Sequence, residues 1–140
     1  MFRKILVADD GSPGGRKAVD TAIALASRFE SELHCISVEE DLPRYVGTLD
    51  EYEEVKDRRD QYFGEIHADS MRRAAEKGVE MHCHIAQGHE VARIVEYCRE
   101  GGFDLLVVGF MGHSGVWGRI WGSTSQNLTR LAPCSVLVVK

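Results

Sequence analysis

The chain has 140 residues, of which 44% are hydrophobic and 28% are charged. At about 150 residues per domain, this length and composition predict one soluble globular domain over 1–140 and exclude a disordered chain. The formal net charge of −5 argues against the broad basic surface that binding to DNA or RNA requires.

The charge is distributed unevenly along the chain. Residues 39–104 hold 17 acidic and 9 basic side chains, and no acidic residue follows Asp104. Residues 105–140 carry a charge of +3 from three basic residues: Arg119, Arg130 and Lys140. An anionic ligand is therefore expected near the last quarter of the chain.

The features that report on cellular compartment predict a cytoplasmic protein. The apolar run near the N-terminus, 5–8, is too short for a signal peptide, and no run approaches the length of a membrane span, so no membrane insertion is expected. The cysteines form no Cys-x-x-Cys pair and are predicted to be buried, reduced thiols. These cysteines are Cys35, Cys83, Cys98 and Cys134.

The first half of the chain predicts two strands and two helices. Residues 5–8 are wholly apolar, as is typical of a strand that is covered on both faces. Ser12 followed by proline suits the N-cap of a helix over 13–29. A second strand is predicted over 33–38, and a long charged helix over 50–77.

The second half predicts three strands and two helices. Alternating hydrophobicity indicates a strand over 79–86, and a helix over 90–99 follows it. Residues 105–108 form another buried apolar run, which leads into a glycine-rich segment. A short helix over 123–131 and a strand over 135–139 come last.

Each longer helix is expected to bury one face. The residues predicted to be buried are Ala18, Ala22, Leu25, Ala26 and Phe29 on the first helix, Val55, Tyr62, Ile66 and Ala74 on the second, and Val91, Ile94, Val95 and Cys98 on the third. Strands that alternate with helices predict a parallel sheet with right-handed crossovers, in a three-layer α/β/α sandwich. Ligands of such sheets bind at the carboxyl ends of the strands, where the winding direction reverses.

The glycine-rich segment 109–122 has the composition of a phosphate site. Five of its fourteen residues are glycine: Gly109, Gly112, Gly115, Gly118 and Gly122. Backbone amides can therefore approach an anion closely, next to the N-terminus of the helix predicted to begin at Ser123. The hydroxyls of Ser123, Thr124 and Ser125 add donors. The segment lacks the Gly-Lys-Ser/Thr ending of a P-loop, and residues 10–15 do not fit the dinucleotide-binding fingerprint.

Three motifs in the right order resemble those of the universal stress proteins. The spacing Gly109-x2-Gly112-x9-Gly122-Ser123 is similar to the ATP-binding signature of that family. Residues 5–12 (ILVADDGS) and 132–139 (APCSVLVV) are similar to its terminal motifs. The resemblance covers the whole chain and favours the ATP-binding branch of the family.

The resemblance implies a flavodoxin-like sheet of strand order 3-2-1-4-5 that binds ATP, ADP or AMP, with Mg²⁺ as a further expected ligand. Asp10 matches the aspartate at the nucleoside end, and Val38 matches the residue that contacts adenine. Asp9 occupies a place that is more often neutral in the family, so its carboxylate is expected to weaken binding or to change which nucleotide is preferred. The complete set of predicted nucleotide-binding residues is Ala8, Asp9, Asp10, Val38, Val108, Gly109, Gly112, His113, Gly122, Ser123, Thr124 and Ser125.

The predicted function is a nucleotide-sensing regulatory module of the stress response, and not an enzyme. The loop offers donors for phosphate but no base to activate water and no lysine clamp. One alternative is a slow ATPase or autokinase in which Ser114, Ser123 or Thr124 receives phosphate. Another is an interaction subunit that never uses nucleotide.

Several histidines and tryptophans are interpreted without a catalytic or metal-binding role. His82 and His84 share one face of a predicted strand, but no third ligand at a suitable spacing indicates a metal site. His113 has no carboxylate in its loop to orient it, so a phosphate or solvent contact is favoured over catalysis. Trp117 and Trp121 are interpreted as anchors of the loop, with stacking on a base as the alternative.

The last strand predicts a homodimer. An apolar strand over 136–139 would lie at the edge of a 3-2-1-4-5 sheet, and pairing with a second copy would bury it. Members of the family that the chain resembles commonly dimerise through this strand.

Overall fold

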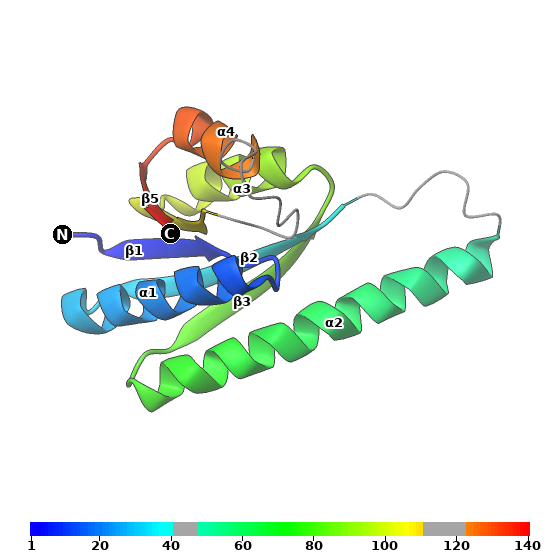
Figure 1. Ribbon diagram of the computed structural model, residues 1–140, viewed down its shortest axis with the longest axis horizontal. Coiled ribbons are helices and arrows are strands. Elements are labelled where there is room, and N and C mark those ends of the chain that lie inside the picture. The colour runs from blue at the N-terminus through cyan, green and yellow to red at the C-terminus, as the bar shows by residue number, and fades with distance from the viewer. Residues whose placement is uncertain (41–47, 111–122) are drawn as a thin grey trace.

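A computed structural model of the chain describes residues 1–40, 48–110 and 123–140. Five parallel strands form one sheet of order β3-β2-β1-β4-β5, with helices on both faces (Figure 1). The strands are β1 Lys4–Ala8, β2 Glu32–Glu39, β3 Met81–Gln87, β4 Leu105–Gly109 and β5 Ser135–Val139. The helices are α1 Pro13–Phe29, α2 Leu49–Glu76, α3 Glu90–Gly101 and α4 Ser123–Leu131. The predicted three-layer sandwich and its strand order are confirmed.

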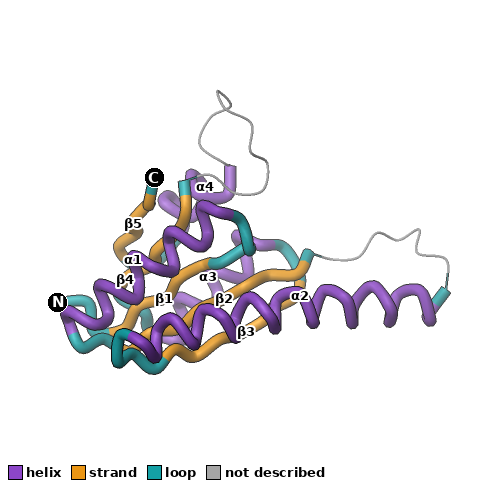
Figure 2. Tube along the Cα trace, turned by 60° about the horizontal axis from the view of Figure 1, so that its bottom comes forward, coloured by secondary structure: helices purple, strands orange, loops and turns teal. Residues whose placement is uncertain are grey.

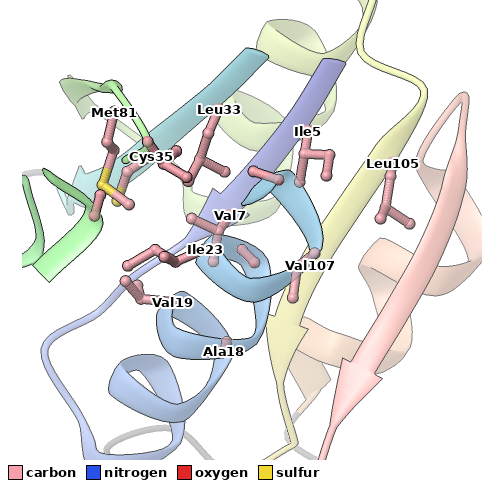
Figure 3. Packing of buried hydrophobic residues seen from close by; sticks show 14 residues of the cluster. Ile5, Val7, Ala18, Val19, Ile23, Leu33, Cys35, Met81, Leu105 and Val107 are labelled. Carbon is pink, nitrogen blue, oxygen red and sulfur yellow. The ribbon is translucent and has the colours of Figure 1, made fainter. Parts of the chain in front are cut away.

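Alternating residues of the central strands fill two separate cores. Ile5 and Val7 of β1 point toward α1 and pack with Val107 of β4 (Figure 3). Leu6 points to the opposite face and packs with Leu106 and with residues of α3 and α4. Because helices cover both faces of β1, its successive residues are all apolar and do not alternate with polar ones.

Helix α1 begins at the carboxyl end of β1 with the predicted cap. Ser12 Oγ accepts a hydrogen bond from the amide of Gly15 at 3.0 Å, and Pro13 occupies the first helical position. The buried face includes Val19 and Ile23. The prediction that Phe29 is buried is wrong: the residue is 43% exposed, at the end of α1, where its ring contacts that of Phe2 edge to face with centroids 6.1 Å apart.

Helix α2 is 28 residues long, which corresponds to about 42 Å, and its N-terminal part extends beyond the sheet (Figure 2). Its buried residues are Phe63, His67, Ser70 and Ala74. The predicted face is therefore wrong in part, since Tyr62 is 45% exposed and Val55 is only half-buried. Two of these four buried side chains, those of His67 and Ser70, are polar. A pattern of hydrophobic residues alone therefore does not reveal which face of α2 is buried.

Strand β3 begins two residues later than predicted, at Met81. The amide of Val79 donates to the carbonyl of Ala74 at 2.9 Å, and Gly78 has a φ of 73°. Val79 therefore belongs to the termination of α2, where a left-handed glycine turns the chain toward the sheet.

The described segments include all four cysteines and every predicted helix. All four cysteines are free, with Cys35 and Cys98 buried and Cys83 and Cys134 half-buried. Within the described segments, no helix combines the length and the apolar character that crossing a membrane requires.

Candidate functional site

The candidate site lies at the carboxyl ends of β1 and β4. These strands are direct neighbours, with Ile5 opposite Leu105 and Val7 opposite Val107. The chain leaves β1 into α1 on one face of the sheet, whereas α3 and α4 pack on the other face. The winding direction therefore reverses between β1 and β4, which is the position where open parallel sheets bind ligands.

Two consecutive aspartates form the turn after β1. Asp9 Oδ1 accepts the amide of Gly11 at 2.9 Å, and Asp10 Oδ1 accepts both the amide and the hydroxyl of Ser12 at 2.9 and 2.5 Å. Asp9 is only 3% exposed, and burial raises the pKa of its carboxyl, with the neighbouring Asp10 adding to the effect. Asp10 thus holds an Asx-type turn.

Glycines seat the start of α1 directly against the end of β4. A Cβ added to Gly109 would lie 2.7 Å from the carbonyl carbon and oxygen of Gly14. A Cβ on Gly15 would lie 2.7 Å from Asp9 Oδ1 and 2.8 Å from Asp10 Oδ1. The backbone of Gly14 and the two aspartate carboxylates therefore fill the space beside these glycines, and no larger residue fits at either position without a shift.

The start of α4 is tied to the same place. Ser125 is 6% exposed, and its hydroxyl donates to the carbonyl of Gly109 at 2.6 Å. No acidic residue lies in the first turn of α4. The positive end of this helix is therefore held beside the end of β4, as the phosphate prediction requires. The side-chain proton of Ser125 is used internally, so only its backbone amide remains as a donor for a ligand.

A carboxylate from α3 reaches this helix start. Glu90, the first residue of α3, is half-buried, and the nearby hydroxyl of Thr124 lowers the pKa of its carboxyl. Burial raises the pKa of Glu90, and the carboxylates of Asp10 and Glu40 raise it further. The segment 105–140 is free of acids in sequence, but the packing of α3 against α4 brings Glu90 near Thr124.

A buried polar network supports the turn after β1, and no sequence motif indicates it. The hydroxyl of Ser37 donates to the carbonyl oxygen of Asp9 at 2.5 Å and lies 2.7 Å from Nε2 of His67. Ser37 is 1% exposed and His67 is 4% exposed. Because the single proton of the Ser37 hydroxyl goes to Asp9, Nε2 of His67 is the protonated nitrogen that donates to Ser37.

Helix α2 also packs directly on this turn. A Cβ placed on Gly11, which has a φ of 81°, would collide with the hydroxyl of Tyr62 and with the end of Ile66. Together with His67, these side chains hold the turn after β1 from the face opposite α3. The i, i+4 spacing of Phe63 and His67 is the one signal from which the buried position of His67 could have been inferred.

The predicted site residues divide into three groups. Ala8, Val38 and Val108 pack in the core on the α3 and α4 face, close to the ends of their strands. Asp9, Asp10, Gly109, Thr124 and Ser125 take part in the contacts just described, and Ser123 is the first residue of α4. Gly112, His113 and Gly122 lie outside the described residues. Ser114, Trp117, Trp121 and Arg119 also lie outside them.

The histidines of β3 have separate partners. The ring of His82 lies 4.9 Å from that of His34, whereas His84 stacks on Tyr97 at 5.0 Å with an interplanar angle of 12°. Among residues 1–40, 48–110 and 123–140, no group of three or more metal-ligating side chains comes together.

Both the sequence and the fold of the chain are similar to those of known proteins. The sequence model of the Universal stress protein family matches residues 1–140. The universal stress protein YxiE of Bacillus subtilis (strain 168) is 32% identical over 148 residues, which cover all of both chains. The structure of the universal stress protein UspA from Lactobacillus plantarum superposes with a TM-score of 0.91 and 24% identity, covering 99% of this chain and 98% of that one.

A second solved structure is a universal stress protein in complex with cAMP. It has a TM-score of 0.77 and is 27% identical, covering 99% of this chain and 97% of that one. The family match over the full chain, the relative of similar length and the shared sheet order agree with the motifs at residues 5–12, 109–123 and 132–139. The chain belongs to the universal stress protein family.

Proposed function

We propose that this protein binds an adenine nucleotide at the carboxyl ends of β1 and β4 and acts in the cytoplasm as a regulatory module without fast catalysis. The observation that carries the proposal is the hydrogen bond from Ser125 to the carbonyl of Gly109, which holds the start of α4 beside the end of β4. The likeness to a universal stress protein in complex with cAMP supports an adenine nucleotide as the class of ligand.

The described residues fit the parts of such a ligand. The first turn of α4 offers backbone amides and a positive dipole end to phosphate. Asp10 offers carboxylate oxygens, which accept hydrogen bonds from ribose hydroxyls. Val38 and Ala8 offer an apolar surface on the α3 face for the base. ATP, ADP and AMP share these three parts, and Mg²⁺ would accompany the polyphosphates.

His67, which contacts β2 near its carboxyl end, has a structural role. Nε2 of His67 is bonded to Ser37, and the ring is 4% exposed, so it cannot take a proton from a water beside a bound phosphate. This burial supports a binding function over hydrolysis.

Isothermal titration with ATP in excess Mg²⁺ tests the proposal. We expect saturable binding at submillimolar nucleotide, and an absence of binding at millimolar nucleotide contradicts it. Incubation with labelled ATP separates the alternatives: we expect intact ATP to be recovered after an hour, whereas released phosphate or labelled protein indicates a slow ATPase or an autokinase.

A homodimer through β5 is part of the proposal. Among the described strands, β5 pairs with β4 alone at the edge of the sheet, and Leu137 is 36% exposed. Pairing with a second copy would cover this edge. Light scattering should then give twice the chain mass of 15.6 kDa, and a monomer at micromolar concentration counts against it.

A further inference from the structure

Two cysteines lie opposite each other on neighbouring strands. Cys35 of β2 is the direct register partner of Cys83 of β3, and the two strands are parallel. Residues at the same position of adjacent strands point to the same face of a sheet. Cys35 belongs to the core under α1, as Figure 3 shows, and Cys83 packs against the same core. The two thiols therefore lie side by side on one face of the sheet.

The separation of the two strands suits a disulfide bond. Neighbouring strands lie about 4.8 Å apart, and the Cα atoms of a disulfide are usually about 4.4–6.8 Å apart. Parallel pairing also holds the two Cβ atoms near the strand spacing, which exceeds the mean of about 3.8 Å in disulfides. A bond between Cys35 and Cys83 can consequently form with a small backbone shift, but under strain. Strained disulfides are the ones that are easily reduced.

The two thiols differ in their access to solvent. Cys35 is 0% exposed, whereas Cys83 is half-buried on β3, which lies at the edge of the sheet. An oxidant from solvent therefore reaches Cys83 first. The nearby thiol of Cys35 lowers the pKa of Cys83, while Cys83 and burial raise the pKa of Cys35. Because the thiolate is the nucleophile, Cys83 is the reactive member and Cys35 the resolving one.

We propose that Cys35 and Cys83 form a thiol pair that hydrogen peroxide converts into a reversible disulfide within one chain. The Cys83 thiolate attacks one peroxide oxygen and the O–O bond breaks, which leaves a sulfenic acid on Cys83 and a hydroxide that takes up the released proton. The Cys35 sulfur then attacks the Cys83 sulfur. The S–S bond forms, the S–O bond breaks, and the hydroxide leaves with the Cys35 proton as water. Two thiols thus lose two electrons, and one peroxide is reduced to two waters.

The other two cysteines provide an internal comparison. Cys98 is buried and Cys134 is half-buried, as in the first pair. Cys98 lies on α3 and Cys134 precedes β5, so strand pairing does not place them opposite each other. Burial raises the pKa of Cys98 to about 12 and also raises the pKa of Cys134. Both thiols therefore stay protonated, and they are poor nucleophiles toward peroxide.

Peptide mapping of the peroxide-treated full chain tests the proposal. Trypsin places the four cysteines in four different peptides, of which 29–44 carries Cys35 and 78–93 carries Cys83. After alkylation of the remaining thiols without reduction, we expect these two peptides to be linked, with the loss of two hydrogen atoms. Cys83 should be consumed at least about tenfold faster than Cys134, because its thiol ionises more easily. Millimolar glutathione should restore both thiols of the linked pair.

Three variants separate the roles of the thiols. Cys35→Ala removes the resolving thiol, so dimedone should trap the sulfenic acid of Cys83 at least about fivefold more than in wild type. Cys83→Ser removes the nucleophile, and Cys35 should then stay reduced because solvent does not reach it. Cys134→Ser is the matched control, since it replaces the other kind of half-buried thiol, and it should form the linked peptides as wild type does. Circular dichroism establishes that each variant is folded.

The peptide map of wild type decides the inference even where a variant does not fold. The inference is wrong if peptides 29–44 and 78–93 are not linked, if the link joins two chains, or if Cys134 is consumed as fast as Cys83. Equal dimedone labelling of wild type and Cys35→Ala would show that Cys35 does not resolve the sulfenic acid, which also contradicts it. The inference is independent of nucleotide binding, so a failure of the proposed function leaves it standing.

Discussion

Replacing Gly109 with valine should lower the free energy of unfolding by about 3 kcal/mol, at the upper end of the usual cost of overpacking, and should abolish nucleotide binding. The first added atom would lie 2.7 Å from the carbonyl carbon and oxygen of Gly14 and 3.2 Å from the amide nitrogen of Gly15. All of these are backbone atoms of the first turn of α1, so relief requires the helix itself to move. Denaturant unfolding gives the stability, and titration with ATP and Mg²⁺ gives the binding.

Gly64→Ala is the matched control. Gly64 lies inside α2, and a Cβ added there meets nothing within 4 Å. Alanine should therefore raise the free energy of unfolding by about 0.5–1 kcal/mol, which is the usual cost of glycine inside a helix. A Gly109→Val protein that keeps wild-type stability and binds ATP normally would show that the contact between β4 and α1 is not required.

Replacing His67 with alanine is expected to cost about 3 kcal/mol of stability, which combines the loss of a buried ring with an unsatisfied partner. The ring packs beside Phe63, at 6.5 Å between centroids, and its Nε2 donates to Ser37 at 2.7 Å. Because Ser37 in turn holds the carbonyl of Asp9, the turn after β1 should loosen as well. Denaturant unfolding measures the loss. His89→Ala, at an exposed N-cap without a side-chain cap bond, should change stability by less than about 0.5 kcal/mol.

The same histidine makes stability depend on pH. Burial lowers the pKa of His67 from its ordinary value of 6.5, and His84 lowers it further, so the folded protein holds a neutral ring while the unfolded chain takes up a proton. Its contribution is therefore complete above pH 6.5 and is lost as the pH falls through the folded-state pKa. Wild type should lose stability between pH 7 and pH 5.

His67→Gln is the informative variant for this dependence, because the amide can still donate to Ser37 but cannot titrate. We expect its stability to fall less than that of wild type over the same pH range, measured by denaturant unfolding at each pH. The raised pKa of Asp9 acts in the opposite direction at lower pH and is common to both proteins. Equal slopes for the two proteins would show that His67 is not the titrating group.

The order of the elements could be predicted because local patterns determine it. The residues of β1 and β4 are buried on both faces of the sheet, so each strand is a continuous apolar run. Such a run predicts a strand without information from the rest of the chain. Helix α2 shows the limit of such patterns, since His67 and Ser70 are buried polar residues that a hydrophobic stripe does not reveal. The side chain of Val79 suits a strand and the pattern predicts one there, whereas its amide hydrogen-bonds the carbonyl of Ala74 and terminates α2.

The candidate site could be predicted only where it is continuous in sequence. The cap at Ser12 and the turn at Asp10 follow from neighbouring residues, and both are present. The charge pattern of the sequence shows no acid after Asp104, but it does not show that α3 packs against α4 and brings Glu90 near Thr124. The contact of Ser37 with His67 joins residues thirty positions apart, and only the tertiary structure places them together.

The central claim, that an adenine nucleotide binds at the ends of β1 and β4, is tested most directly by following backbone amide shifts of the labelled protein by NMR during titration with ATP and Mg²⁺. The account predicts the largest shifts at Asp10, Gly109 and Thr124, and none at the cavity by the amino ends of β2 and β3, which is lined by Glu30 and Glu80. An absence of shifts at millimolar nucleotide, or shifts centred on that opposite cavity, would contradict it.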